Sequence, residues 1–585
     1  MSFRDVFRIT GFAACFVSTL AFSTLTFAQS SPFPEAATGV SASKGGEGHS
    51  YMVVAANPLA ADAGARIIKA GGTAADAAIA VQLVLGIVEP QSSGIGGGAF
   101  ALYWNNATKE LASYDGRETA PGAAAENRFL TAEGKPMGRM TAIVGGKSVG
   151  VPGVLRMMEL FHKQHGKLSW AKDFQPAIDI AEKGFAISPR LYQLLAGDSA
   201  LAASETARAF YYDAQGRPKP VGTVLKNPKL TAVLREVASK GADAFYTGRI
   251  AADIVKTVDS AARNPGDMTV DDLKNYRAVQ RPPVCGLYRQ HKVCSMGPPS
   301  SGAVGIIQSL GVVERFDLRG LGPQSAGAEH LLIEAGRLAL ADRAMYLADP
   351  DKVNVPTDAL ISPDYLKQRS ALISLDARIP KAEAGKVPVK GAALVGAPSP
   401  ELPSTSHFSI VDRDGNAIAV TTSVEAAFGS RLMVDGFILN NQLTDFSYED
   451  VAESRTVANR VEGGKRPRSS MSPTLVFDPD GKLEIVVGSP LGASIVAIVV
   501  KTLVGMIDWQ MTPEAVAAMP GALIFGNNGV LIEDGLEPIK ADLERLGHQV
   551  RVGEYASGIH AIRITKNGLL LGGADPRREG VVVGE

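Results

Sequence analysis

The stretch ELPSTSHFSIVDRDGNAIAVTT, residues 401–422, decides how the second half of this chain folds. After its three hydroxyl residues, apolar and polar side chains alternate, which is the period of a β-strand. Asp414-Gly415-Asn416 interrupts the alternation and is typical of a hairpin turn, so HFSIVD and AIAVTTSV are expected to pair as strands. Residues 376–404 are rich in Pro, Ala, Gly and Lys, the composition of a flexible linker. The hydroxyl triplet therefore lies where a linker meets the first strand of a β-rich unit.

This position would suit a nucleophile that becomes active only after the chain is cut in front of it. A threonine at a new N-terminus carries both the attacking Oγ and, in its own α-amine, the base that takes the proton. The ordinary pKa of an α-amine is about 7.7–8.0, close to working pH, so it needs little adjustment. On spacing alone, however, an ordinary Ser/Thr loop is the better explanation.

Length and charge limit the classes of protein that remain. At 585 residues, the chain is expected to form two intimately packed lobes or several domains. The net charge of -1 provides no field that would attract nucleic acid or anionic lipid, so neither is expected as a partner. A charged fraction of 20% suits a tightly packed globular enzyme better than a disordered chain.

The first 28 residues have the pattern of a secretory signal peptide. Arg4 and Arg8 precede an apolar stretch, and Thr26-Phe27-Ala28 fits a small-x-small cleavage site. The alternative, a membrane anchor, is disfavoured because the strongly apolar part is shorter than a span. The apolar run at 494–507 is also short and contains Lys501, which indicates a buried helix. We expect no stable membrane span and a mature chain that begins near Gln29, in a periplasm or secreted.

Two cysteines remain after removal of the signal peptide, Cys285 and Cys294. The residues between them indicate a tight hairpin that would bring both side by side. An oxidising compartment favours a disulfide, and the alternative is two reduced cysteines on neighbouring strands.

Several other elements are expected from their patterns. Residues 58–70 fit a helix, and Thr73 with Asp76 three residues later resembles a capping box that begins a second one. VPGVLRMMELFHKQHG fits an amphipathic helix with Pro152 near its first turn. Residues 29–50 are rich in Ser, Gly and Ala and are expected to be loose.

Two motifs suggest cofactors but lack the necessary context. GIGGGA at 94–99 fits a dinucleotide-binding pattern, yet a helix is expected before it and a strand after it, the reverse of what that motif requires. His162 and His165 have H-x-x-H spacing, but the eight histidines show no cluster with acidic or cysteine partners, so surface histidines are expected. No cofactor and no metal ion are predicted.

An ordered set of segments resembles the gamma-glutamyltransferase (glutathione hydrolase) family of N-terminal-nucleophile hydrolases. The set runs from about residue 52 to about residue 580: PLAADAGARIIKAGGTAADAAIAVQLVLGIVEPQSSGIGGGAF, DGRETAP, SVGVPG, GPPSSG, ADRAMYLADP, PSTSHFSIVDRDGNAIAVT, FGS, LNNQLTDFS, KRPRSSMSPT and GSPLG. The resemblance implies an α/β fold, a four-layer αββα sandwich made of two subunits from one precursor. These would be a large subunit, 29–404, and a small catalytic subunit, 405–585.

The resemblance also implies roles for individual residues. Cleavage between Ser404 and Thr405 would make Thr405 the nucleophile, steadied by the hydroxyl of Ser423. The donor α-carboxylate would be held by a guanidinium fork and hydroxyls, and the α-ammonium by an acid and an amide. GSPLG would form the oxyanion loop through its backbone N–H groups. The residues so assigned are Arg117, Ser469 and Ser470 for the carboxylate, Gln442 and Asp445 for the ammonium, and Leu491 and Gly492 for the oxyanion.

Three departures from the family pattern leave the substrate open. Glu425 stands where the family often has Asn, Leu491 where it usually has Gly, and Ser423 where it has Thr. The resemblance implies an enzyme acting on γ-glutamyl compounds such as glutathione, with water or an amino acid or peptide as acceptor. The alternatives are an acylase of the same fold acting on a glutaryl- or cephalosporin-type amide or poly-γ-glutamate, and a binding protein that no longer cuts itself.

Overall fold

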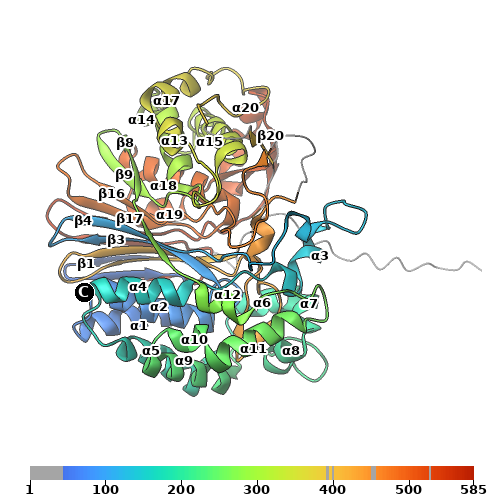
Figure 1. Ribbon diagram of the computed structural model, residues 1–585. Helices are drawn as coiled ribbons and strands as arrows, with labels where there is room; N and C mark the ends of the chain where they lie inside the picture. Colours follow the sequence, from blue (N-terminus) through green and yellow to red (C-terminus); the bar gives the residue numbers. More distant parts are fainter. Residues whose placement is uncertain (1–43, 390–393, 398–400, 403, 449–455, 526–528) are drawn as a thin grey trace, which may run out of the picture. The chain divides into compact units, whose positions relative to one another are not determined.

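Two antiparallel β-sheets of seven strands each form the centre of the computed structural model (Figure 1). Sheet 1 has the order β23-β2-β11-β12-β3-β4-β7 and sheet 2 the order β1-β22-β21-β17-β16-β9-β8. The strands of sheet 1 are β23 (Val581–Gly584), β2 (Met52–Ala55), β11 (Thr405–Val411), β12 (Ala417–Ser423), β3 (Gly98–Asn105), β4 (Glu110–Gly116) and β7 (Val279–Arg281). Those of sheet 2 are β1 (Lys44–Gly48), β22 (Leu570–Ala574), β21 (His560–Ile564), β17 (Leu483–Gly488), β16 (Thr474–Phe477), β9 (His291–Ser295) and β8 (Val284–Tyr288).

The structure describes residues 44–389, 394–397, 401–402, 404–448, 456–525 and 529–585. The predicted signal peptide and part of the predicted linker lie outside these residues. In the part of the chain that is described, no helix is both long enough and apolar enough to cross a bilayer.

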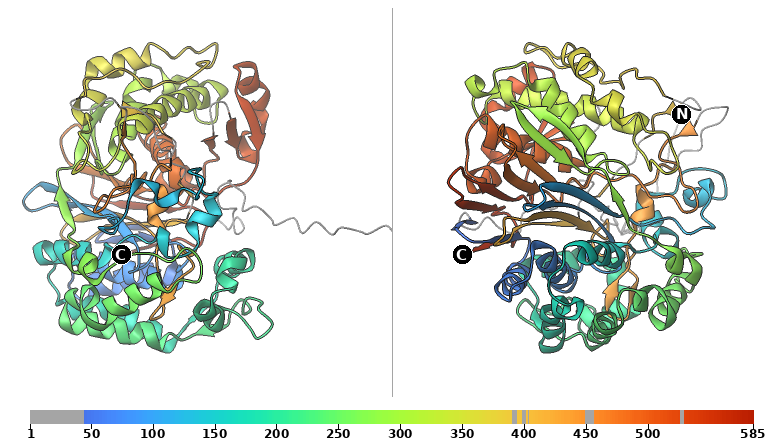
Figure 2. Two further views of the ribbon diagram at one scale, coloured as in Figure 1. Left: turned by 45° about the vertical axis from the view of Figure 1, so that its right-hand side comes forward. Right: turned by 60° about the vertical axis from the view of Figure 1, so that its left-hand side comes forward.

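Helices cover the outer face of each sheet, which gives the predicted four layers (Figures 1 and 2). Below sheet 1 in Figure 1 lie α1 (Pro58–Lys69), α2 (Ala74–Val88), α4 (Val154–His165), α5 (Trp170–Lys183), α9 (Pro228–Lys240), α10 (Asp243–Tyr246), α11 (Gly248–Asp259) and α12 (Val270–Asn275). Above sheet 2 lie α13 (Gly302–Val313), α15 (Ala326–Tyr346), α17 (Pro363–Ser370), α18 (Ile495–Ile507) and α19 (Pro513–Ala518).

Shorter elements complete the described part of the chain. The remaining helices are α3 (Arg139–Ile143), α6 (Pro189–Gly197), α7 (Ser199–Ala202), α8 (Glu205–Tyr211), α14 (Leu318–Leu321), α16 (Thr357–Leu360) and α20 (Lys540–Arg545). The short strands are β5 (Phe185–Ala186), β6 (Val224–Leu225), β10 (Leu394–Val395), β13 (Met433–Val434), β14 (Phe437–Ile438), β15 (Thr456–Val457), β18 (Ala522–Phe525), β19 (Gly529–Ile532) and β20 (Gln549–Val552).

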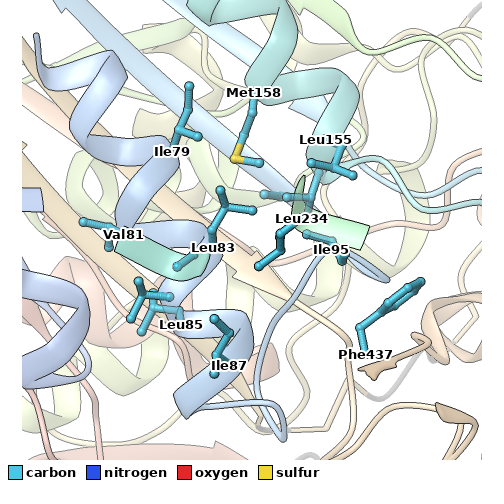
Figure 3. Packing of buried hydrophobic residues seen from close by; sticks show 14 of the residues in the cluster. Ile79, Val81, Leu83, Leu85, Ile87, Ile95, Leu155, Met158, Leu234 and Phe437 are labelled. Carbon is cyan, nitrogen blue, oxygen red and sulfur yellow. The ribbon is translucent and has the colours of Figure 1, made fainter. Parts of the chain in front are cut away.

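The central strands of sheet 1, β2, β11, β12 and β3, are buried on both faces, so each contributes to two hydrophobic cores. In β3, Ala101 and Tyr103 face the helices, while Phe100 and Leu102 join the core between the sheets. Because successive strand residues point to opposite faces, one strand can serve both cores. On the helical side, Figure 3 shows Leu83 of α2 near Leu155 of α4 and Leu234 of α9, within one cluster.

The predicted hairpin is confirmed and lies at the centre of sheet 1. β11 and β12 pair in antiparallel register, from Thr405 opposite Ser423 to Val411 opposite Ala417. β2 flanks β11 and β3 flanks β12. The pairing makes Thr405 the first residue of β11, and it places Ser423 directly across from it.

Other predicted elements are confirmed. Thr73 and Asp76 form a complete capping box at the start of α2, and the apolar run at 494–507 forms the buried helix α18. GIGGGA follows α2, and its last two residues begin β3, as expected. Pro152 directly precedes Gly153, the N-cap of α4, and so lies near the first turn as predicted.

The expectation of a loose segment at 29–50 is wrong for Lys44–Gly48, which forms the edge strand β1 paired with β22. The strand packs closely at Gly46, where a Cβ would lie 2.8 Å from Cγ1 of Val582 in β23. The predicted disulfide between Cys285 and Cys294 is present and joins β8 to β9.

Candidate active site

Thr405 and Ser423 meet at the end of the central hairpin. The Thr405 hydroxyl donates a hydrogen bond of 3.0 Å to Ser423 Oγ, and the Ser423 hydroxyl donates one of 3.1 Å to the carbonyl oxygen of Ser404. Ser423 Oγ also accepts a bond of 2.8 Å from the N–H of Glu425. One hydroxyl thus connects the threonine to the carbonyl of the peptide bond that precedes it.

Buried charges hold the strand that carries Thr405. The Ser406 hydroxyl donates to Glu89 at 2.7 Å, and Glu89 also pairs with Arg190. Arg578 donates a bond of 3.3 Å to the Thr405 carbonyl oxygen. Ser404 is fixed as well, because its hydroxyl donates to the Gln91 carbonyl at 2.7 Å.

Arg117 and Asp445, predicted to bind opposite ends of a donor, contact each other. Arg117 Nη2 lies 2.6 Å from Asp445 Oδ2, and Gln442 Nε2 donates to the same oxygen at 3.1 Å. Arg117 also donates to the carbonyl oxygens of Pro467 and Arg468. The structure therefore brings these three predicted residues together. The Arg117 guanidinium donates its hydrogen bonds to the Asp445 carboxylate and to two backbone carbonyl oxygens.

Burial strongly affects the acids near Arg117. Burial, followed by repulsion from the Glu425 carboxylate, raises the pKa of Asp445, and Arg117 opposes this rise. Burial also raises the pKa of Glu118 to about 8, again against the attraction of Arg117. Burial lowers the pKa of Arg117, but the nearby acids, Asp445 first, raise it by more. The net pKa is above its ordinary value, so the guanidinium remains charged.

Glu425 is buried and holds a backbone conformation that is uncommon for its residue type, with φ of 80°. Its carboxylate accepts bonds from Arg139 at 3.1 Å, Asn441 at 2.5 Å and the N–H of Leu402 at 2.9 Å. The acid at this departure from the family pattern thus has its own cation, Arg139, and contacts the segment before the predicted cut.

Ser469 and Ser470 lie beside that same segment. The Ser470 N–H donates to Glu401 Oε2 at 3.0 Å, and Glu401 forms an ion pair with Arg343. Ser469 is held through its carbonyl oxygen, which accepts a bond from the Ser301 N–H at 2.7 Å. A carboxylate of the chain therefore already lies against one of the two serines predicted to bind a carboxylate.

The loop with Leu491 and Gly492 follows β17, which packs against β11 and β12. A Cβ at Gly488, the last residue of β17, would lie 2.3 Å from the His407 ring. The end of β17 therefore packs against β11 at His407, two residues after Thr405. Gly492 has φ of 50° and begins a short 3-10 turn, Gly492–Ser494. Leu491 is 2% exposed and its side chain belongs to the core between the sheets.

The expectation that the histidines form no cluster with acidic partners is wrong. His162 Nε2 lies 3.3 Å from Asp173 Oδ2 and 3.6 Å from Asp76 Oδ1. His330 Nδ1 lies 2.8 Å from His548 Nε2, with Glu334 nearby. These partners come from distant segments, so sequence spacing could not reveal them.

Both clusters are integrated into the hydrogen bonding of the fold. Asp76 accepts bonds from the N–H groups of Thr73, Lys167 and Leu168. Glu334 accepts one from the Ile379 N–H and another from Arg337.

Sequence reasoning missed Arg139, Arg343, Glu401 and Glu118. Arg343 and Glu118 stand inside quoted motifs, ADRAMYLADP and DGRETAP, and Glu401 begins the opening stretch. Charge within those motifs could have drawn attention to them. Arg139 carries no such signal, because it reaches Glu425 across 286 residues of sequence.

Comparisons with known proteins show which family the chain resembles and which fold it shares. The family model for gamma-glutamyltranspeptidase matches residues 60–585. The glutathione hydrolase proenzymes of Bacillus subtilis (strain 168) and Escherichia coli (strain K12) are 37% and 35% identical to the chain, with 92% and 90% of each chain covered. The crystal structure of cephalosporin acylase from Bacillus halodurans superposes with a TM-score of 0.80 at 26% identity, covering 95% of this chain and 98% of that one.

The family match spans nearly the whole described chain, and the two relatives exceed 30% identity over most of their length. The fold is the αββα sandwich of the N-terminal-nucleophile hydrolases, and the protein is an enzyme. The chain belongs to the gamma-glutamyltranspeptidase family.

Proposed function

We propose that this enzyme cuts itself between Ser404 and Thr405 and then uses Thr405 as an N-terminal nucleophile on γ-glutamyl amides such as glutathione. The observation that carries the proposal is the relay from the Thr405 hydroxyl through Ser423 Oγ to the Ser404 carbonyl oxygen, at 3.0 and 3.1 Å. It aligns a nucleophile, its partner and the bond to be cut.

The cut begins with attack by Thr405 Oγ on the carbonyl carbon of Ser404. The Ser423 hydroxyl, which donates to the carbonyl oxygen, stabilises the negative charge that develops there. The C–N bond breaks, the proton of the hydroxyl goes to the new α-amine, and an ester links Ser404 to Thr405 Oγ. Water then hydrolyses this ester and leaves a free carboxylate on Ser404 and a free hydroxyl on Thr405.

Turnover repeats this chemistry on a donor. The α-amine of Thr405 takes the hydroxyl proton while Oγ attacks the γ-carbonyl carbon, and the amine of the donor leaves as the γ-glutamyl ester forms. N–H groups of the loop with Leu491 and Gly492 stabilise the oxyanion. Water releases glutamate, and an amino acid or peptide acceptor instead yields a new γ-glutamyl amide.

Opposite charges in the site suit an α-amino acid end. Arg117, Ser469 and Ser470 are assigned to the α-carboxylate. The acids Asp445 and Glu425, with Gln442, are assigned to the α-ammonium. No metal ion or other cofactor takes part in these steps.

The enzyme is processed at its N-terminus as well as at the internal cut. Residues 1–28 are a signal peptide that directs the enzyme to the periplasm or outside the cell. The large subunit, 29–404, and the small subunit, 405–585, stay associated because β2 and β3 of the first flank β11 and β12 of the second in sheet 1.

A second candidate is an acylase acting on a glutaryl- or cephalosporin-type amide. The similarity to a cephalosporin acylase over 95% of the chain favours it. The two candidates differ in the donor, because a glutaryl group keeps the carboxylate of a γ-glutamyl group and lacks its ammonium.

Kinetics on matched anilides separate these candidates. We expect the wild type to hydrolyse γ-glutamyl-p-nitroanilide with a higher kcat/KM than glutaryl-p-nitroanilide, and to hydrolyse glutathione. Glu425→Gln keeps the side-chain length but removes the charge. It should lower the ratio of kcat/KM on γ-glutamyl-p-nitroanilide to that on glutaryl-p-nitroanilide. A wild type that prefers the glutaryl compound contradicts the γ-glutamyl assignment and supports the acylase.

A further inference from the structure

Glu401 and Leu402 lie against groups of the proposed donor site. The Glu401 carboxylate contacts the Arg343 guanidinium and the Ser470 N–H, while the Leu402 N–H donates to Glu425 Oε1 at 2.9 Å. A carboxylate at one end and an N–H donor at the other are also the groups that an amino-acid donor presents. The two residues stand only a few positions before the predicted cut.

Arg343 pairs with a carboxylate of the segment just before the predicted cut, whereas Arg117 forms its ion pairs outside that segment, with Asp445 and Glu118. Among the described residues, Glu401 is the carboxylate that forms an ion pair with Arg343, whose side chain is 9% exposed. Arg117 instead pairs with Asp445 of the small subunit and with backbone carbonyls. When cleavage frees the segment ending at Ser404, a nearly buried guanidinium can lose its anion, a costly state unless another anion replaces it.

The surroundings of Arg343 hold its side chain in place. Its Nε donates to Ser301 Oγ at 3.1 Å, and Arg468, fully buried, donates to its carbonyl oxygen at 2.7 Å. These contacts do not depend on Glu401. The guanidinium thus keeps its position when its carboxylate partner changes.

A pocket gives a ligand access to this guanidinium. Its walls include Ser301 and Arg343, and it extends to Ala493 and Ser494, the residues directly after Gly492. The other lining residues are small or aliphatic, such as Gly305 and Ala339. Arg343 and the two residues that follow the proposed oxyanion loop therefore line one pocket.

We propose that Arg343, together with the Ser470 N–H, is a binding site for the donor carboxylate, and that Glu401 occupies this site in the uncut chain. This inference rests on the proposed function. It adds a second guanidinium to the recognition of the donor, one that becomes available when the linker segment leaves. A free acid at this end of the donor is then a requirement for efficient turnover.

The test compares two donors that differ only in that acid. 4-Aminobutanoyl-p-nitroanilide lacks the carboxylate of γ-glutamyl-p-nitroanilide and keeps the amine. The ratio of the two kcat/KM values, measured on one preparation, does not depend on how much of the chain has been cut. Arg343→Met should lower this ratio at least about tenfold, the scale of one lost contact to a charged group. Arg343→Lys should lower it less.

Arg337→Met is the matched control. Arg337 is also nearly buried on α15 and pairs with an acid, Glu334. It lies six residues, or about 9 Å along the helix, before Arg343. It should leave the ratio unchanged. A second measurement uses the rise in melting temperature that L-glutamate produces in the purified enzyme, which should shrink in Arg343→Met and persist in Arg337→Met.

A wild type inactive on γ-glutamyl-p-nitroanilide overturns the proposed function itself. A wild type active on it, with an unchanged ratio and an unchanged glutamate effect in Arg343→Met, overturns only the assignment of Arg343.

Discussion

Arg117 and Ser423 show how single residues fit the proposed chemistry. Ser423 Oγ accepts from the Thr405 hydroxyl and donates to the Ser404 carbonyl, so Ser423 supplies the hydroxyl that the proposed relay needs. Arg117 uses several donors at once, on Asp445, Pro467 and Arg468. Such a planar fork cannot be reproduced by a single ammonium.

Arg117→Lys keeps the charge and loses this fork. We expect self-cleavage to persist, because Arg117 does not contact Ser404 or Thr405. Activity on γ-glutamyl-p-nitroanilide should fall by about tenfold or more, since a charge-assisted contact is worth at least about 1.4 kcal/mol. Steady-state kinetics on the cut enzyme measure this. Unchanged kinetics would show that Arg117 does not take part in donor binding.

Glu118 gives the stability a pH dependence of definite sign. Burial raises its pKa to about 8 from an ordinary 4.5. The stability associated with the neutral carboxyl is therefore complete below about pH 4.5 and is lost as the pH rises through about 8. Glu118→Gln should make the melting temperature vary less between pH 5 and pH 8.

The exposed Glu126 provides the control for this experiment. Glu126→Gln should show the same pH dependence as the wild type, with apparent melting temperatures measured at one scan rate. If Glu118→Gln also matched the wild type at both pH values, the buried acid would not be protonated in the folded protein.

At the scale of elements, the strand pair β8–β9 is closed by a disulfide, while the pair β11–β12 is held by the sheet alone. β8 is the edge strand of sheet 2, where a hairpin gains least from neighbouring strands. Cys285 and Cys294 are directly opposite each other and nine positions apart. The bridge fixes the edge of the layer that packs against α13.

Replacing both cysteines by alanine should lower the stability by about 2–3 kcal/mol, as expected for a loop this short. The melting temperature should fall in the variant, and a reducing agent should lower that of the wild type and not that of the variant. Two free thiols in the denatured, unreduced wild type would contradict the disulfide.

Local sequence patterns predicted some strands and helices and missed others. Alternating residues and a turn signal predicted β11 and β12, and Thr73 with Asp76 predicted the start of α2, because these features depend on neighbours in sequence. β1 was missed because its sequence, KGGEG, has no strand preference. It is a strand because it pairs with β22 and packs closely against Val582 of β23, which is a tertiary effect.

At the scale of the whole molecule, the site is assembled from segments that are far apart in the chain. Resemblance to a family supplied Thr405, Arg117 and Asp445, and the structure brings the last two into contact across 328 residues. The pairing of Arg343 with Glu401 follows from the path of the segment before the cut, which no local pattern encodes. Sequence therefore indicated which groups matter, and the fold determines which of them meet.

The central claim is that Thr405 becomes a new N-terminus. The most direct measurement is the intact mass of the purified protein under denaturing conditions, with N-terminal sequencing of each fragment. We expect two chains, the smaller spanning 405–585 and beginning Thr-Ser-His-Phe, and we expect Thr405→Ala to remain one inactive chain. A single uncut chain that nonetheless hydrolyses γ-glutamyl amides would contradict the account.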